Sequence, residues 1–199
     1  MQRTNYIFID YENVQPKDLS RVKGRCAEVH LVMGSRQESP SRRLENQIKE
    51  HAEKVKVVRT PLARPNALDF VLAFELGNQA VQDPGGYFHI VSRDKGFDVL
   101  IKHLRKKKIL AARRESLSEI PALMTTEERF DHLIARLADP EMGRPARLTK
   151  LRSTIQAHFD GALNPDVVDK AIDLLIHKGI IEVLENGKVE YPERGQSAG

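Results

Sequence analysis

The stretch YFHIVSRDKGFD, residues 87–98, runs from an apolar strand through a short polar turn into a helix. The run at 87–91 is rich in aromatic and β-branched residues and is typical of a buried strand. Helical spacing begins at residue 96 and continues to 106, with apolar side chains on one face. A strand that leads directly into a helix is the unit from which α/β proteins are built.

The same unit recurs on both sides of this stretch. We expect strands at 5–10, 27–33, 55–58, 87–91 and 108–112, and helices at 16–24, 40–53, 67–81 and 96–106. Strands that alternate with helices favour crossover connections and a parallel sheet. The sequence therefore predicts an α/β domain with a mainly parallel five-stranded sheet.

The pattern changes after Arg114. Helices are expected at 126–138 and 148–158, and a third starts at Asn164 and Pro165, a favoured cap followed by a favoured first residue. An Asn-Gly pair at 186–187 then predicts a hairpin turn. Three helices and a hairpin indicate a winged helix, so we expect domains at 1–115 and 116–192, with a disordered tail at 193–199.

Composition sets further limits. The chain has 199 residues, a net charge of +4 and a single cysteine, Cys26, so it has no intramolecular disulfide and suits a reducing compartment. No run is long enough for a membrane span, no signal-peptide core precedes the first strand, and no Cys/His cluster has zinc spacing. We therefore expect a cytoplasmic protein without a membrane partner.

Four acidic residues stand at strand ends and helix starts: Asp10, Asp69, Asp94 and Asp98. The carboxyl ends of parallel strands share one edge of a sheet, so these side chains are expected to converge there. Carboxylates suit hard cations such as Mg2+ or Mn2+, and such a cation supports phosphodiester chemistry. The alternative is that each acid only caps a helix or a turn, although carboxylates in apolar segments would then be costly.

Three motifs carry a resemblance to a known family: IFIDYEN at 7–13, NALDF at 66–70 and SRDKGFD at 92–98. Together they resemble the PIN-like superfamily, and within it the bacterial NYN-type branch, over residues 5–114. The resemblance implies a three-layer α/β/α fold and Mg2+- or Mn2+-dependent ribonuclease activity. It implies that Asp10, Asp69, Asp94 and Asp98 are the catalytic and metal-binding residues.

The same resemblance implies that Asn13 and Ser92 belong to the cleft, where we count them with the substrate-binding residues. Arg64, Arg93 and Lys95 flank the acidic motifs and are the basic residues that we expect to contact substrate. A further basic run at 102–114 suits phosphates, although lysine at a helix end is also favoured without any ligand.

The C-terminal module is less clearly a nucleic-acid binder. Arg144, Arg147, Lys150 and Arg152 give its entry a basic face. Its third helix, in the place of a recognition helix, is acidic rather than basic. Nucleic-acid binding, protein contact and formation of a homodimer all remain open for this module.

The sequence as a whole favours a metal-dependent endoribonuclease that acts on single-stranded or structured RNA. One alternative is a non-catalytic RNA- or DNA-binding regulator that keeps the fold. Another is a phosphatase with Asp10 as nucleophile, which is disfavoured because residue 12 is Glu rather than the usual Asp.

Overall fold

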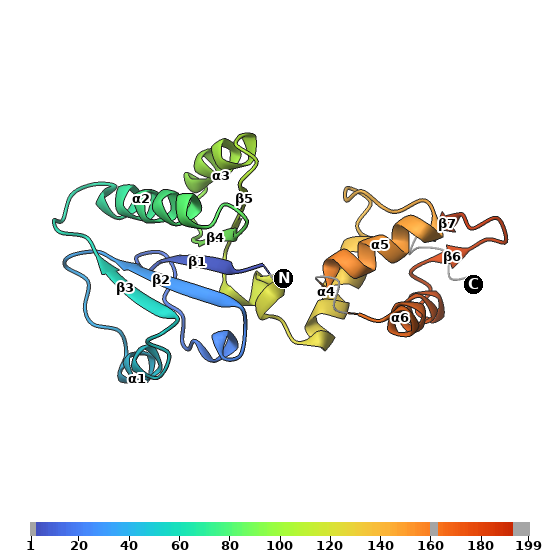
Figure 1. The fold of residues 1–199 in the computed structure, drawn as a ribbon, viewed down its shortest axis with the longest axis horizontal. Coiled ribbons are helices and arrows are strands. Elements are labelled where there is room, and N and C mark those ends of the chain that lie inside the picture. The colour runs from blue at the N-terminus through green and yellow to red at the C-terminus, as the bar shows by residue number, and fades with distance from the viewer. Residues whose placement is uncertain (1–2, 160–162, 193–199) are drawn as a thin grey trace, which may run out of the picture. The chain divides into compact units, whose positions relative to one another are not determined.

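A computed structural model describes residues 3–159 and 163–192 of the chain. The chain divides into two compact units, Met1–Met124 and Thr125–Gly199 (Figure 1). The tail predicted at 193–199 lies outside the described residues. Among the described helices, none is both long enough and apolar enough to cross a membrane.

Five strands form the sheet of the first unit: β1 (Asn5–Asp10), β2 (Ala27–Met33), β3 (Val55–Arg59), β4 (Tyr87–Val91) and β5 (Leu110–Arg114). Their order in space is β3-β2-β1-β4-β5, and every neighbouring pair is parallel. The predicted five-stranded parallel sheet is confirmed. The strand order reverses between β1 and β4, which is where open parallel sheets bind ligands, beyond the carboxyl ends of the strands.

Helices cover both faces of this sheet. They are α1 (Arg42–Glu50), α2 (Ala67–Gln82) and α3 (Phe97–Lys106). Figure 1 shows α1 on one face and α2 with α3 on the other. The predicted three-layer α/β/α arrangement is confirmed.

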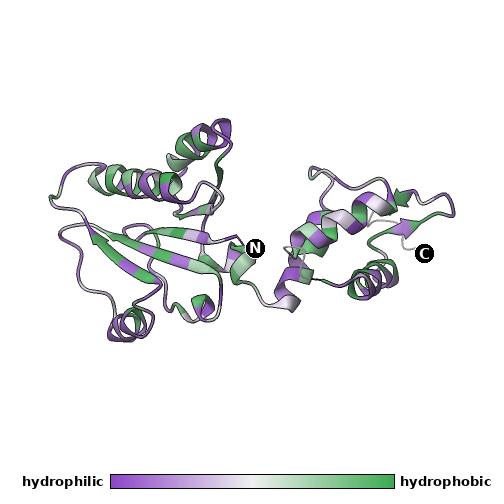
Figure 2. Ribbon diagram, viewed as in Figure 1, coloured by the Kyte–Doolittle hydropathy of each residue, from purple (hydrophilic) through white to green (hydrophobic). Residues whose placement is uncertain are grey.

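Alternation along the strands divides the core into two. In β1, Ile7 and Ile9 pack with Leu44 of α1, whereas Tyr6 and Phe8 pack with α2 and α3. Successive side chains of a strand point to opposite faces, so a strand covered on both faces is apolar throughout. Figure 2 shows the strands mainly in the hydrophobic colour and α1 mainly in the hydrophilic colour.

The helix predicted over 16–24 is wrong. Only one 3-10 turn, Ser20–Val22, forms there. The backbone N–H of Leu19 donates to Gln47 Oε1 at 2.9 Å, and the N–H of Ser20 donates to Asp18 Oδ1 at 3.2 Å. Side chains thus take the donors that a helix would use, and the segment becomes a loop packed on the core.

The first unit extends beyond the predicted boundary at 115. Two 3-10 turns, Leu117–Glu119 and Pro121–Leu123, follow β5. Leu117, Ile120 and Leu123 are buried in the core that α1 covers. These turns therefore close one side of the α/β unit.

The second unit contains α4 (Thr126–Ala138), α5 (Leu148–His158), α6 (Pro165–His177) and the antiparallel strands β6 (Glu182–Val183) and β7 (Val189–Glu190). Asn164 caps α6 by accepting the N–H of Val167 at Oδ1, 2.9 Å away. Gly187 turns the hairpin with a φ of +73°, a conformation that glycine adopts without strain. The predicted order of three helices and a hairpin is observed.

Candidate active site

Asp10 is the centre of a hydrogen-bond network at the switch point of the sheet. It ends β1 and is fully buried. Its Oδ2 accepts from Ser92 Oγ and from Asn13 Nδ2, each at 2.8 Å. Its Oδ1 accepts the backbone N–H groups of Glu12 and Asn13, each at 3.2 Å. Four donors thus fix the orientation of one carboxylate.

Ser92 links this carboxylate to the next acidic residue. Its hydroxyl donates to Asp10 and accepts the backbone N–H of Asp94 at 3.0 Å. Asp94 in turn accepts the N–H of Gly96 at Oδ1, 2.7 Å away. The third motif is therefore held against the end of β1 by one buried hydroxyl. The bonds from N–H groups to Asp10 and Asp94 also show that both acids order their loops, as the capping interpretation expected.

Asp69 completes a group of three carboxylates. It lies in the first turn of α2 and is half-buried. Burial raises the pKa of its carboxyl group, and the negative charges of Asp10 and Asp94 raise the pKa further. Residues from three separated motifs therefore repel one another across this edge of the sheet. We call Asp10, Asp69 and Asp94 the acidic centre.

Asp98 has a different partner. Its Oδ1 accepts from Arg113 Nε at 2.9 Å, and Arg113 also donates through Nη1 to the backbone oxygen of Ser92 at 2.9 Å. It is not among the residues that raise the pKa of Asp69. The structure thus divides the four predicted acids into a group of three and one ion pair.

Arg113 is a site residue that sequence reasoning placed only in a general basic run. It lies in β5, next to β4, so its side chain reaches both the end of β4 and the start of α3. The position of Arg113 in the sequence could have predicted this placement. An arginine near the carboxyl end of a strand, beside a strand that leads into an acidic motif, is placed at the same edge of the sheet.

The acidic centre has the chemistry of a site for a hard cation. The atoms that could coordinate a cation are all carboxylate oxygens. Within residues 3–159 and 163–192, no lysine or arginine forms an ion pair with any of the three residues. Oxygen donors and uncompensated negative charge suit Mg2+ or Mn2+. As the described side chains lie, no three His, Cys, Asp or Glu residues form a closed ligand set. The fit therefore rests on donor type and charge.

A family model described as PIN domain matches residues 4–114. The chain belongs to the PIN-domain family. Proteins of this family are typically nucleases that use divalent metal ions. No curated protein and no solved structure matches the chain. The matched range covers all five strands of the sheet and all three residues of the acidic centre.

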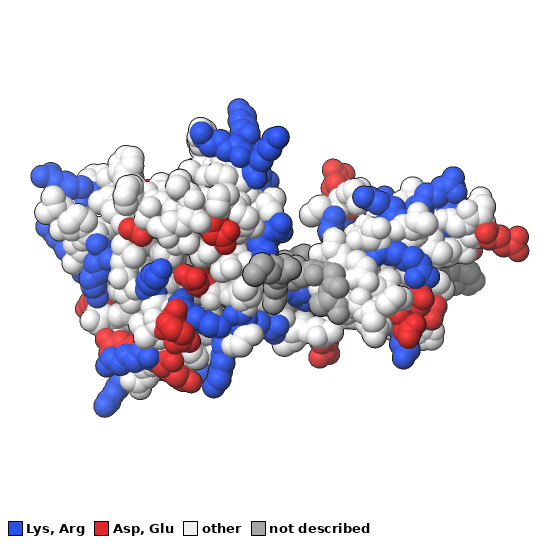
Figure 3. All heavy atoms as spheres, in the orientation of Figure 1, with Lys and Arg blue, Asp and Glu red and all other residues white. Residues whose placement is uncertain are grey.

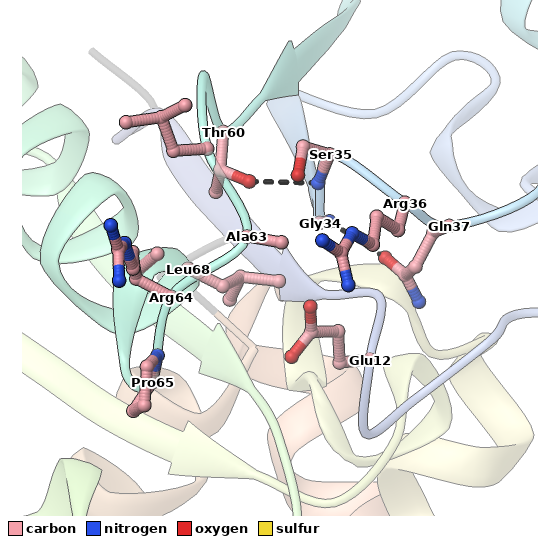
Figure 4. Close-up of a pocket in the computed structure, with 12 residues that line it drawn as sticks. Glu12, Gly34, Ser35, Arg36, Gln37, Thr60, Ala63, Arg64, Pro65 and Leu68 are labelled. Atoms are coloured by element: carbon pink, nitrogen blue, oxygen red, sulfur yellow. Dashed lines mark hydrogen bonds between the residues drawn. The ribbon is translucent and has the colours of Figure 1, made fainter.

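One cavity of the PIN unit, of about 570 Å³, opens beside the first motif. Figure 4 shows Glu12 and Arg36 on one side of it and Arg64 on the other. A Cβ atom at Gly34 would lie 2.1 Å from Glu12 Oε1, so the glycine lets this carboxylate pack closely. Arg64 is thus exposed in a cavity lined by basic and acidic groups, in the loop that leads to α2.

Arg93 and Lys95 lie elsewhere along the same edge. Both are exposed and flank Asp94 in the turn between β4 and α3. A second cavity, of about 600 Å³, contains both Asp69 and Asp94. Arg64, Arg93 and Lys95 are therefore exposed in the segments that carry Asp69 and Asp94, where they are available to a polyanion.

Proposed function

We propose that this PIN-domain protein is a metal-dependent endoribonuclease of the NYN type, with Mg2+ or Mn2+ bound by Asp10, Asp69 and Asp94. The observation that carries the proposal is the fully buried carboxylate of Asp10 at the switch point of the sheet, which the hydroxyl of Ser92 links to the backbone of Asp94. The raised pKa of Asp69 supports it, because burial and the charges of Asp10 and Asp94 raise that pKa. Such a cluster of carboxylates is costly without a cation, and no lysine or arginine among the described residues forms an ion pair with any of the three.

The residues around the centre have separate tasks. When bound, a divalent cation supplies activation of a water and stabilisation of the leaving oxygen. Ser92 and Asn13 orient Asp10, and burial of Asp10 keeps that orientation fixed. Arg113 holds Asp98 and the backbone of Ser92, so it positions the third motif. Arg64, Arg93 and Lys95 would contact phosphates of the RNA.

The C-terminal unit, which we propose to be a winged helix, would add affinity without taking part in the reaction. Its basic residues are partly engaged within the unit. Arg152 forms an ion pair with Asp169, and Arg147 Nη1 donates to the backbone oxygen of Asn186 at 3.2 Å. Lys150 on α5 is exposed. Contact with RNA through α5 therefore fits the charges better than contact through the acidic face of α6.

A cleavage assay tests this proposal. Single-stranded RNA labelled at its 5′ end is incubated with the protein in Mn2+, Mg2+ or EDTA, beside a DNA strand of the same sequence. We expect cleavage of the RNA with either metal and none in EDTA. Binding without cleavage would identify a regulator that keeps the fold, and cleavage unaffected by EDTA would contradict the metal centre.

A further inference from the structure

The two helices that carry residues next to the acidic centre, α2 and α3, expose large apolar side chains. Phe70 and Phe74 of α2 are 72% and 70% exposed, and Val99 of α3 is 74% exposed. Large apolar side chains gathered at the surface usually mark a place where a ligand or partner binds. The neighbouring residues indicate which kind of ligand or partner suits this surface.

Phe70 and Val99 differ from Phe74 in their surroundings. Both line the second cavity, which also contains Asp69 and Asp94. Phe74 lies one turn further along α2 and is not part of the cavity lining. The lining of the cavity therefore combines apolar side chains with two residues of the acidic centre.

Positive charge adjoins these apolar side chains. His103 also lines the cavity, and exposed basic residues surround it in the sequence at the C-terminal end of α3: Lys102, Arg105 and Lys106 within the helix and Lys107 directly after it. Figure 3 shows Lys and Arg gathered over the end of α3. An occupant of this surface needs flat apolar faces, negative charges beside them, and a group that suits a cation at the carboxylates.

We infer that Phe70 and Val99 form a base-binding subsite for one nucleotide of single-stranded RNA, next to the phosphate at the acidic centre. Bases stack on exposed aromatic rings, and the phosphates that follow would run toward the basic end of α3. This inference rests on the proposed ribonuclease function and specifies how its substrate is held. Because stacked bases must be unpaired, it favours single-stranded over duplex RNA.

A second copy of the chain is a poorer occupant. An interface between copies at Phe70 would bury the carboxylates of Asp69 and Asp94, and buried unpaired charges are costly. The cores of protein interfaces are depleted in charged residues for the same reason. A nucleotide with its cation instead compensates those charges.

Binding of a ten-nucleotide RNA that carries one 2-aminopurine tests the subsite. The full chain with Asp10→Asn is used, in Mn2+ and in EDTA, so that the RNA is not consumed. Phe70→Ala should weaken binding about tenfold and abolish the quenching of 2-aminopurine by stacking. Phe70→Tyr retains an aromatic ring and should preserve both signals. Phe74→Ala, the matched control on the same helix face, should bind as the parent does.

An RNA of equal length without bases at the central positions separates stacking from charge. The parent should bind this strand about as weakly as Phe70→Ala does, and Phe70→Ala should lose nothing further. Equal loss of binding in Phe74→Ala, or none in Phe70→Ala, would overturn the inference. So would light scattering that shows a dimer converted to monomers by both alanine variants.

Failure of the base-binding subsite and failure of the ribonuclease function give different results. If the wild-type protein cleaves no RNA but Phe70 still quenches 2-aminopurine, the subsite stands and the ribonuclease function fails. If the wild-type protein cleaves with Mn2+ and Phe70→Ala binds and cleaves equally well, only the subsite fails.

Discussion

The two units of the chain use polar residues in opposite ways. Within the described residues, every polar or charged residue that is buried as a whole lies in the PIN unit: Asn5, Asp10, His30, His51, Thr60, His89 and Ser92. The core of the C-terminal unit consists of aliphatic side chains and Phe159. Burying a polar group costs free energy that an apolar core avoids. The buried carboxylate and hydroxyl of the candidate site, Asp10 and Ser92, thus belong to the PIN unit, and the described residues of the C-terminal unit include no polar residue buried as a whole.

Among the changes that test this difference between the units, replacing the buried carboxylate of Asp10 should have the largest effect on activity. We expect Asp10→Asn to lower metal-dependent cleavage by more than about 100-fold, since a bound cation supplies several kcal/mol of stabilisation. The amide oxygen can take the place of Oδ2 and keep the bonds from Ser92 and Asn13. The NH2 group would then replace Oδ1 and lose the bonds from the N–H groups of Glu12 and Asn13, so we also expect a lower melting temperature. The melting temperature of the variant shows whether the fold is kept, and its cleavage rate in Mn2+ measures the loss of activity. Undiminished cleavage by a folded variant would remove Asp10 from the reaction.

Removing the hydroxyl that links the motifs should have an intermediate effect. Ser92→Ala deletes the bond to Asp10 Oδ2 and the acceptor for the N–H of Asp94. Loss of groups that orient metal ligands typically costs about 10–100-fold in activity or metal affinity. A lower rate at saturating Mn2+ indicates a loss of activity, and a higher Mn2+ concentration for half-maximal rate indicates a loss of metal affinity. Ser92→Thr, which keeps a hydroxyl, should recover part of the loss, and no recovery would argue against the hydrogen bond.

Deleting the C-terminal unit should have a smaller effect, on binding alone. A chain ending at Met124 should still cleave short RNA, but it should bind longer RNA more weakly and with a shallower dependence on salt. A chain ending at residue 115 loses Leu117, Ile120 and Leu123 from the core and should be unstable. Equal affinity of the Met124 chain at every salt concentration would assign the C-terminal unit to a protein partner or to a dimer.

The smallest effect concerns stability without metal. Burial and two neighbouring carboxylates raise the pKa of Asp69, so the folded state favours its protonated form. Stability from this group is present at low pH and is lost as pH rises through the raised pKa. Asp69→Asn should therefore raise the melting temperature of the metal-free protein slightly at pH 7. The gain should vanish below about pH 3.9, the ordinary pKa of aspartate, and a gain that persists there would contradict the electrostatic origin.

Much of the fold could be predicted from the sequence because its signals are local. Apolar runs such as 5–10 and 87–91 are covered on both faces, so their composition alone identifies strands. Asp10 and Asp94 follow such runs directly, and the parallel topology then brings them to one edge. The helix predicted over 16–24 was wrong because the donors of Leu19 and Ser20 are taken by Gln47, which is distant in sequence, and by Asp18.

The partners within the site depended on tertiary contacts. Asp98 lies one turn beyond Asp94, and its spacing alone cannot distinguish a place in the acidic centre from the ion pair with Arg113 that forms across to β5. The cavity beside Phe70 was not predicted either, because exposure of an aromatic residue depends on which helix face the sheet covers.

Calorimetric titration of Mn2+ into the metal-free protein tests the central claim most directly. Wild type, Asp69→Asn and Glu53→Gln are compared, because Glu53 is an exposed carboxylate in the turn before β3, at the opposite edge of the sheet. We expect wild type and Glu53→Gln to bind Mn2+ with the same affinity, and Asp69→Asn to bind at least about tenfold more weakly, since each missing 1.4 kcal/mol is a factor of ten. Equal binding by Asp69→Asn, or no binding by wild type, would contradict a metal site formed by Asp10, Asp69 and Asp94.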